Sequence, residues 1–287
     1  MDRIVIMMLD ASNAMLVLML VSLGLAIIFG LMNVINMAHG EFLMLGSYAM
    51  LTLTEIGLPF WAALAIAPLF VAATGLLAEE VLVRHTYERL LDTILATVGL
   101  SLALRQLIVL TYGPGSFAVV APNLGTVLIA GSPYPVYRLL VMTIALTAIV
   151  CTVWVFFHTR FGLAARAAIA NRAMASALGI DTRRLDRITF ALGAGLAGLA
   201  GAVMAPLTSI DPAVGVGWLV PAFLAVLVGG LGSIAGPLIG SAGVGALDSV
   251  TAALASPIAA QLVVFVTAVI LIRLYPNGLI AQRRRES

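Results

Sequence analysis

Long, almost uninterrupted apolar runs follow one another along the chain. A helix needs about 20 mostly apolar residues to cross the hydrocarbon core of a bilayer, which is about 30 Å thick. The runs lack the alternation of apolar and polar positions that a membrane β-barrel requires. The pattern therefore predicts membrane-spanning helices over about residues 11–31, 37–53, 60–78, 93–112, 136–157, 189–206, 218–231, 236–255 and 258–272.

The predicted fold class is all-α, a polytopic membrane helical bundle with about nine transmembrane helices. Two short apolar runs meet at Gly229–Gly236. This region can hold two full spans or a partly re-entrant segment, so eight to ten spans are compatible with the sequence. No soluble domain is attached, and residues 1–287 are expected to form a single transmembrane domain.

Composition agrees with a membrane protein and excludes several function classes. Hydrophobic residues make up 62% of the chain and charged residues 10%, against about 45–50% and about 25% in soluble domains. All 15 basic residues are arginine, so the chain has no lysine for a P-loop of its own. The net charge of +2 is too small to suggest nucleic acid as a partner.

No set of residues points to catalysis, a cofactor or a metal. Cys151 is the single cysteine, which excludes an intramolecular disulfide and a cysteine-based metal site. His39 and Glu41 are two residues apart, a spacing that does not direct both side chains to one face of a helix. The sequence therefore predicts neither an enzyme nor a bound cofactor or metal.

The placement of arginine predicts the orientation. Twelve of the 15 arginines fall in three segments, 84–92, 158–188 and 273–285. Loops rich in arginine stay on the cytoplasmic side. The connections 113–135 and 207–217 contain no arginine and are expected on the outer side. Nine spans, with the N-terminus outside and the C-terminus inside, place each of these segments on the side that its arginine content predicts.

The cytoplasmic segment 158–188 is long for a turn between spans. Residues 162–178 are rich in helix formers, and Gly179 lies where a glycine would end the helix. Asp181 and Thr182 then mark the start of the next structural element. A short helix flanked by arginines is predicted here. It is either an amphipathic helix on the membrane surface or a docking helix for a soluble partner.

Small residues recur at a spacing of four in two places, Ala194, Gly198 and Ala202, and then Gly232, Gly236 and Gly240. This spacing lets helix backbones approach closely in lipid, so helix packing is the expected role. The Gly236-Pro237 pair is also expected to free backbone groups at membrane depth, which favours a translocation path beside it.

Five polar residues at or near membrane depth are candidates for gating or for lining a path. Asn36, His39 and Glu41 lie at the predicted cytoplasmic entry of the second span and form either a helix cap and anchor or a gate. Arg105 lies in the fourth span, where snorkelling, a buried ion pair or a role in the path is possible. Asp248 lies among small residues, where a charge is costly enough to suggest function.

Several strings of residues together resemble the permeases of bacterial ABC importers for branched-chain amino acids, including the related urea and short-amide branch. They are Asn36-Met-Ala-His-Gly-Glu41 with Gly46-Ser-Tyr48, Asn171-Arg-Ala-Met174, Leu178-Gly-Ile180, Thr189-Phe-Ala-Leu-Gly-Ala-Gly-Leu-Ala-Gly198, Val228-Gly-Gly-Leu-Gly-Ser233 and Pro276-Asn-Gly-Leu279. The resemblance covers nearly the whole chain. Asn171–Met174 and Thr189–Gly198 look more like the urea branch.

The resemblance implies a permease domain in the bacterial inner membrane that works with a homologous second permease, two ATP-binding subunits and a periplasmic solute-binding protein. The cytoplasmic segment 158–188 is similar in position to the coupling segment of such permeases. Residues Arg166, Asn171, Arg172, Leu178, Gly179 and Ile180 are its candidate coupling residues. The alternative function is an autonomous secondary transporter or channel for a small neutral solute, which would favour inverted repeats or paired carboxylates.

Overall fold

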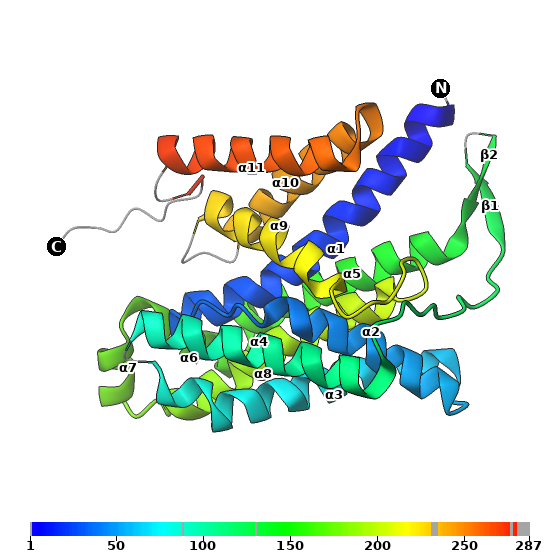
Figure 1. Ribbon diagram of the computed structural model, residues 1–287. Coiled ribbons are helices and arrows are strands. Elements are labelled where there is room, and N and C mark those ends of the chain that lie inside the picture. The colour runs from blue at the N-terminus through cyan, green and yellow to red at the C-terminus, as the bar shows by residue number, and fades with distance from the viewer. Residues whose placement is uncertain (1, 88, 130, 231–234, 276–277, 280–287) are drawn as a thin grey trace. The chain divides into compact units, whose positions relative to one another are not determined.

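The computed structural model describes all residues except 1, 88, 130, 231–234, 276–277 and 280–287. Helices dominate the described chain (Figure 1). In chain order they are α1 (Asp2–Met32), α2 (His39–Glu55), α3 (Phe60–Val81), the 3₁₀ helix η1 (Val83–His85), α4 (Leu90–Tyr112), α5 (Val136–His158), α6 (Arg160–Ala170), α7 (Arg172–Ala177), α8 (Thr182–Met204), α9 (Val214–Gly229), α10 (Ala235–Leu254) and α11 (Pro257–Leu274).

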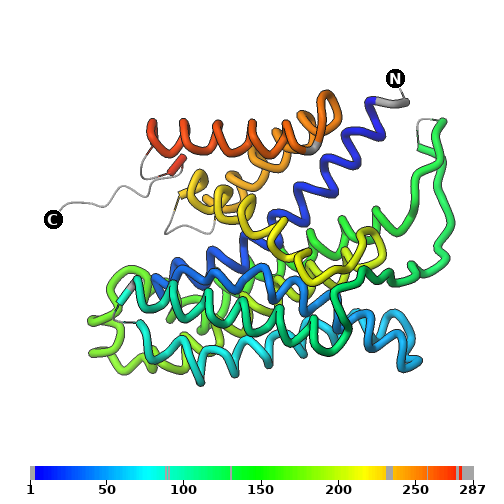
Figure 2. The backbone as a smooth tube through the Cα atoms, viewed as in Figure 1, coloured from blue at the N-terminus to red at the C-terminus, as the bar shows by residue number. Residues whose placement is uncertain are grey.

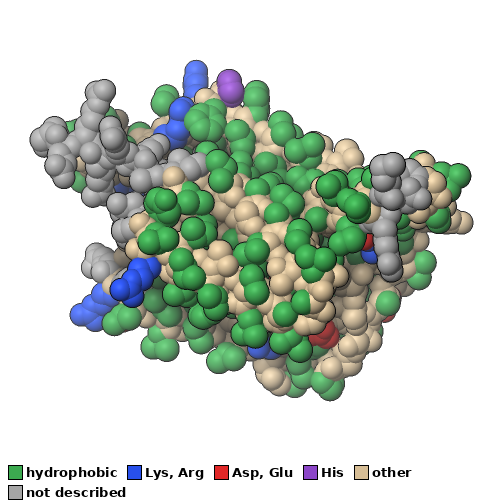
Figure 3. Space-filling model, turned by 90° about the horizontal axis from the view of Figure 1, so that it is seen from above, with side chains coloured by type: hydrophobic (Ala, Val, Ile, Leu, Met, Phe, Trp, Pro, Cys, Tyr) green, Lys and Arg blue, Asp and Glu red, His purple; other side chains and the backbone are tan. Residues whose placement is uncertain are grey.

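The protein is an all-α, multi-pass membrane protein, as the sequence predicts. Within the described residues, six helical segments are long and apolar enough to cross a membrane, and they belong to α1, α3 with η1, α4, α5, α8 and α10. Two shorter apolar helices lie at Val214–Gly229 and Ile258–Leu274. Each of the nine predicted spans coincides with a helix. Hydrophobic side chains are spread over the described part of the face seen in Figure 3, with few charged side chains among them.

The chain divides into two compact units. One consists of Met1–Ala26, Pro122–Ile149 and Val220–Ser287, and the other of Ile27–Ala121 and Val150–Leu219. The second unit contains α2, α3, α4, α6, α7 and α8. It also contains most of the residues that the sequence singles out.

The core of the second unit is the packing of α2 against α8 and α3, which lie side by side in Figure 1. Phe42 and Phe190 meet edge to face with ring centroids 5.9 Å apart. Gly46 lies so close to Gly198 that a Cβ atom on Gly46 would stand 2.1 Å from the Gly198 carbonyl oxygen. Ala194 and Ala202 are fully buried. Small residues thus allow backbone contact between these helices.

In the first unit, α10 and α11 form a helical hairpin (Figure 2). Gly236 and Gly240 face backbone atoms of α9, since a Cβ on Gly240 would stand 2.0 Å from the Ala225 carbonyl oxygen. Gly232 lies outside the described residues. Gly236-Pro237 falls in the first turn of α10, where proline removes no intrahelical hydrogen bond. The expectation that this pair frees backbone groups of a membrane helix therefore does not apply to α10.

Residues 160–177 form two helices, α6 and α7, instead of one, which corrects the prediction of a helix over 162–178. The chain breaks at Asn171, whose extended backbone ends α6 and whose side chain accepts a hydrogen bond from the Met174 amide to cap α7. Asparagine favours such a cap over a helix interior. Gly179 follows α7 at φ +86°, and Asp181 caps α8 through the Arg184 amide, as predicted.

A short antiparallel hairpin occupies part of the connection 113–135. Its strands are β1 (Thr126–Ile129) and β2 (Ser132–Pro135), with Val127 opposite Tyr134. The sequence does not predict it, because the strands have only four residues each.

Candidate functional site

A buried polar cluster marks the start of α2. Asn36 and His39 are fully buried. The Asn36 side-chain oxygen accepts a hydrogen bond from the Ala38 amide at 3.1 Å, and Thr97 of α4 accepts one from the Met37 amide at 3.2 Å. These contacts satisfy amides that precede the helix, so the cluster fixes where α2 begins.

Glu41, in the first turn of α2, is paired with α4. Its side chain is 3% exposed and forms an ion pair with Arg105, whose side chain is 32% exposed. Ser101 also donates a hydrogen bond to Glu41 Oε1 at 2.9 Å. Among the described residues, Glu41 Oε2 and Arg105 Nε have no hydrogen-bond partner. Arg105 of α4 thus forms an ion pair with α2 inside the second unit.

Asp248, the remaining polar candidate, belongs to the other unit. It is partly buried in α10, and no side chain in the described part of the chain pairs with it.

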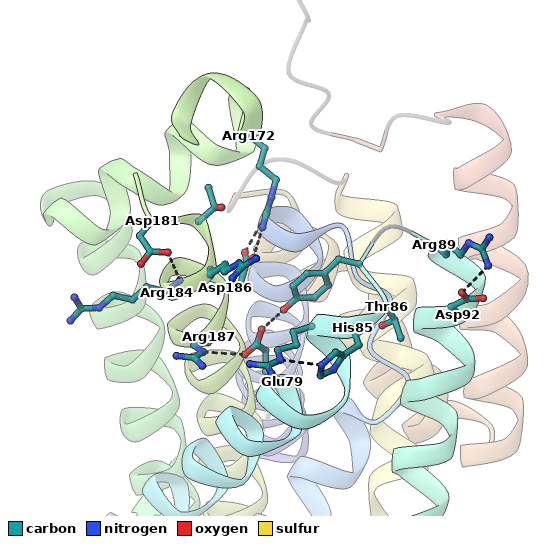
Figure 4. A pocket seen from close by; sticks show the side chains of 14 residues that line it. Glu79, His85, Thr86, Arg89, Asp92, Arg172, Asp181, Arg184, Asp186 and Arg187 are labelled. Carbon is teal, nitrogen blue, oxygen red and sulfur yellow. Dashed lines mark hydrogen bonds and ion pairs between the residues drawn. The ribbon is translucent and has the colours of Figure 1, made fainter. Parts of the chain in front are cut away.

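A charged pocket of about 1050 Å³ lies at the ends of α3, η1, α7 and α8 that the sequence predicts to be cytoplasmic (Figure 4). Four acidic and six arginine side chains line it, together with His85, Thr86, Tyr87 and Thr182. The charged residues are Glu79, Asp92, Asp181, Asp186, Arg84, Arg89, Arg172, Arg183, Arg184 and Arg187. Ion pairs join several of these side chains, namely Arg172 with Asp186, Arg187 with Glu79 and Arg89 with Asp92.

One of these pairs joins α7 to α8. Arg172, at the first position of α7, reaches Asp186 with both terminal nitrogens, and Nη1 lies 3.1 Å from Oδ1 (Figure 4). Asp186 is 1% exposed. The same Nη1 lies 3.4 Å from the carbonyl oxygen of Leu31 in the last turn of α1. The bidentate geometry fixes the orientation of the guanidinium.

A second network joins α3 to α8. Arg187 forms ion pairs with Glu79 and Glu80, and its Nε lies 3.9 Å from Glu79 Oε2. The Tyr87 hydroxyl donates a hydrogen bond to Glu79 Oε1. Asp186 and Arg187 are adjacent on α8, and adjacent side chains point about 100° apart around a helix. Asp186 therefore faces α7 while Arg187 faces α3.

Tyr87→Phe is expected to make stability less sensitive to alkaline pH. Burial, and next the hydrogen bond to Glu79, raise the pKa of Tyr87 above its ordinary value of 10.0. In the unfolded chain the phenol ionises near that value, while in the folded protein it keeps its proton. The free energy of unfolding should therefore fall as the pH rises above 10, by about 1.4 kcal/mol per pH unit from this group.

Thermal unfolding of the purified protein in detergent between pH 8 and 11 checks this expectation. The Tyr87→Phe protein should be less stable below pH 10 by about 1 kcal/mol, because it lacks one hydrogen bond, and should lose less on going to pH 11. Equal losses in both proteins would contradict the role assigned to the phenol.

The remaining coupling candidates have diverse environments. Arg166 folds back on α5, with its guanidinium 5.2 Å from the centroid of the Phe157 ring. Leu178 is 74% exposed, and Met174, four residues earlier, is 57% exposed. Ile180 is half-buried beyond Gly179. An apolar surface made by Met174 and Leu178 therefore stands open on and beside α7.

Sequence reasoning missed Glu79, Asp186 and Arg187. A signal was present, because acidic residues are rare in this chain and Glu79 and Asp186 each adjoin an apolar run. Among the described residues, no three His, Cys, Asp or Glu side chains form a group that could hold a metal ion. The ion pairs of the charged pocket join α7 to α8 and α3 to α8.

Comparison with known proteins gives consistent matches over most of the chain. The family model described as branched-chain amino acid transport system / permease component matches residues 7–274. The high-affinity branched-chain amino acid transport system permease protein LivH of Salmonella typhimurium is 27% identical over 279 residues, covering 92% of this chain and 91% of that protein.

Two further relatives come from distant organisms. The permease protein BraD of Pseudomonas aeruginosa, of the same type of transport system, is 26% identical over 285 residues, covering 92% of this chain and 91% of that protein. A probable branched-chain amino acid transport permease protein LivH of Methanocaldococcus jannaschii is 28% identical over 275 residues, covering 92% of this chain and 86% of that protein. No solved structure matches the chain.

Proposed function

Because the chain belongs to the family of permease components of branched-chain amino acid transport systems, we propose that it is the transmembrane permease subunit of an ATP-driven importer for a small polar solute. It is a multi-pass transport subunit and not a catalytic enzyme. The family match over residues 7–274 is the observation that carries the proposal. The single permease domain would lie in the bacterial inner membrane, with nine crossings, the N-terminus outside and the C-terminus inside.

Because the chain has no lysine for a P-loop of its own, the proposal assigns ATP hydrolysis to partner subunits. The proposed assembly therefore contains two ATP-binding subunits, a homologous second permease and a periplasmic solute-binding protein, within the lipid of the membrane. Closure of the ATP-binding subunits would switch the permeases between outward and inward access. Such a switch requires that the partners bind the two states with different affinity.

The segment 158–188 is the proposed contact with an ATP-binding subunit. Its most exposed large apolar side chains are Leu163, Met174 and Leu178, which are 63%, 57% and 74% exposed. Arginines flank them on both sides. A helix that offers apolar anchors within a polar rim suits docking into a groove on a soluble partner. These exposed anchors favour docking over a helix lying on the membrane surface.

The proposed solute is a branched-chain amino acid, since the relatives described above are all named for this transport. Urea or a short amide, which two sequence strings favour, is the second candidate. Asn36, His39, Glu41, Arg105 and Asp248 are the proposed gating and path residues. An intramembrane ionisable residue is a functional candidate by default, because its charge is costly in lipid.

Copurification followed by an ATPase assay tests the proposal. The chain should be recovered from native membranes with a second permease and an ATP-binding subunit, and leucine with its binding protein should stimulate hydrolysis. Stimulation by urea with its own binding protein would keep the importer and change the solute. Recovery of the chain alone, with transport that needs no ATP, would reject the proposal and favour a secondary transporter or channel.

Shortening residues 166–178 is expected to abolish solute-stimulated ATP hydrolysis while membrane insertion persists. The deletion removes Met174 and Leu178, and with them the apolar anchors of α7. Hydrolysis, uptake and membrane-bound protein are measured in parallel. The matched control replaces an exposed apolar pair outside the segment, Leu91 and Leu95 of α4, with alanine. Normal uptake by the shortened protein would reject the docking role.

A further inference from the structure

The side chain of Arg172 is 42% exposed, but its guanidinium is engaged within the protein. Arg172 opens α7, and its guanidinium turns toward α8, where it pairs with Asp186 (Figure 4). The same guanidinium also lies near the Leu31 carbonyl of α1. Arg172 thus connects a six-residue cytoplasmic helix to two much longer helices.

We propose that Arg172 is a positioning residue that ties α7 to α8 through Asp186, so that a displacement of α7 by the ATP-binding subunit moves α8 with it. This inference rests on the coupling role proposed for the segment 158–188. It gives Arg172 a different task from Met174 and Leu178: those side chains contact the partner, and Arg172 passes their movement to the membrane helices.

Burial of Asp186 makes this connection resist separation. Its side chain is 1% exposed while Arg172 is in place, so sliding α7 away would leave a largely buried carboxylate without its cation. Removing one partner of a buried ion pair is strongly unfavourable for this reason. The two nitrogen–oxygen contacts of the guanidinium also fix its direction, which a single contact would not. Helices α7 and α8 are therefore held together during a shared movement.

The connection continues from α8 to α3. Arg187, the next residue after Asp186, pairs with Glu79 and Glu80 at the end of α3. Further along, α8 is in backbone contact with α2 at Gly201, where the Gly201 carbonyl also accepts a hydrogen bond from Ser47 Oγ at 3.0 Å. A movement that enters through α7 thus reaches α2, which carries Glu41 in its first turn.

The test uses the complete importer, reconstituted in liposomes with its ATP-binding subunits, second permease and binding protein. The key variant is the double substitution Arg172→Gln and Asp186→Asn, which removes the connection without leaving a buried charge. We expect the complex to assemble and hydrolyse ATP, but the solute imported per ATP hydrolysed should fall at least tenfold. The reciprocal exchange, Arg172→Asp with Asp186→Arg, should recover a substantial part of this ratio.

The matched control is the double substitution Arg89→Gln and Asp92→Asn. Arg89 and Asp92 form an ion pair in the same pocket, but both belong to the start of α4 or its N-cap, and their side chains are 79% and 51% exposed. Since this pair connects no two helices, the control should keep the normal ratio. Thermal unfolding of each permease separates a loss of stability from a loss of coupling.

The inference is overturned if the Arg172→Gln, Asp186→Asn complex imports solute with the normal ratio, or if the control loses coupling to the same extent. Failure of the proposed function gives a different result. In that case, the unaltered chain would not assemble with ATP-binding subunits or respond to solute. An unaltered importer that couples normally therefore isolates the test of Arg172.

Discussion

Gly46→Ala is expected to lower the free energy of unfolding by about 1–3 kcal/mol, the usual cost of overpacking a close-packed interior. The added Cβ would stand 2.1 Å from the Gly198 carbonyl oxygen and 2.7 Å from the Gly198 Cα. These are backbone atoms of α8, so no side chain can rotate away. The two helices must separate, and the Ser47–Gly201 hydrogen bond one residue further along α2 would lengthen with them.

Gly99→Ala in α4 is the matched control for Gly46→Ala. Gly99 is also in the middle of a helix, but a Cβ there would meet no atom within 4 Å. Alanine at this position should be neutral or stabilising by up to about 1 kcal/mol, because it is the better helix former. Unfolding of both variants in detergent compares them directly. Equal stability of the two proteins would mean that α2 and α8 do not pack as closely as the structure has them.

Gly46 packs against α8 whereas a Cβ on Gly99 would meet no atom within 4 Å. This difference shows how much of the fold the sequence can predict. Apolar runs place the membrane helices, since burial in lipid demands about 20 apolar residues in a row whatever their neighbours are. The spacing of Gly198 with Ala194 and Ala202 predicts a packing face, but not its partner. Gly46, which forms the other half of that contact, has no such spacing around it. Pairings between helices depend on tertiary structure, which periodicity does not encode.

The polar residues show a similar division. Glu41 and Arg105 are individually conspicuous in a chain with so few charges, and the sequence singles out both. Their ion pair joins residues 64 positions apart in the sequence. No local sequence pattern can therefore predict it. Asp186 and Arg187 lie seven and eight residues after Gly179, and from the sequence alone they are assigned to a cytoplasmic connection. They belong to α8 because Asp181 caps this helix earlier than the apolar run alone indicates.

Arg105→Gln is expected to be the most damaging single change to the cluster at the start of α2. It leaves the Glu41 carboxylate, whose side chain is 3% exposed, without its cation. Such a change typically costs about 3–5 kcal/mol. Glu41→Gln should cost less, because the Arg105 side chain is 32% exposed and retains some contact with its surroundings. Ser101→Ala, which removes one hydrogen bond to Glu41, should cost only about 1 kcal/mol.

The double variant Glu41→Gln, Arg105→Gln tests whether the Glu41–Arg105 ion pair anchors the start of α2 or acts as a gate during transport. With no charge left unpaired, its free energy of unfolding should recover most of what Arg105→Gln loses. If the ion pair only anchors the start of α2, solute uptake in the reconstituted importer should recover in proportion. If the pair opens and closes during transport, uptake should stay low although the protein is stable, because neutral side chains cannot separate and pair again with the same change in energy. We expect the second result, since both Glu41 Oε2 and Arg105 Nε keep an unused hydrogen-bonding position within the described part of the chain.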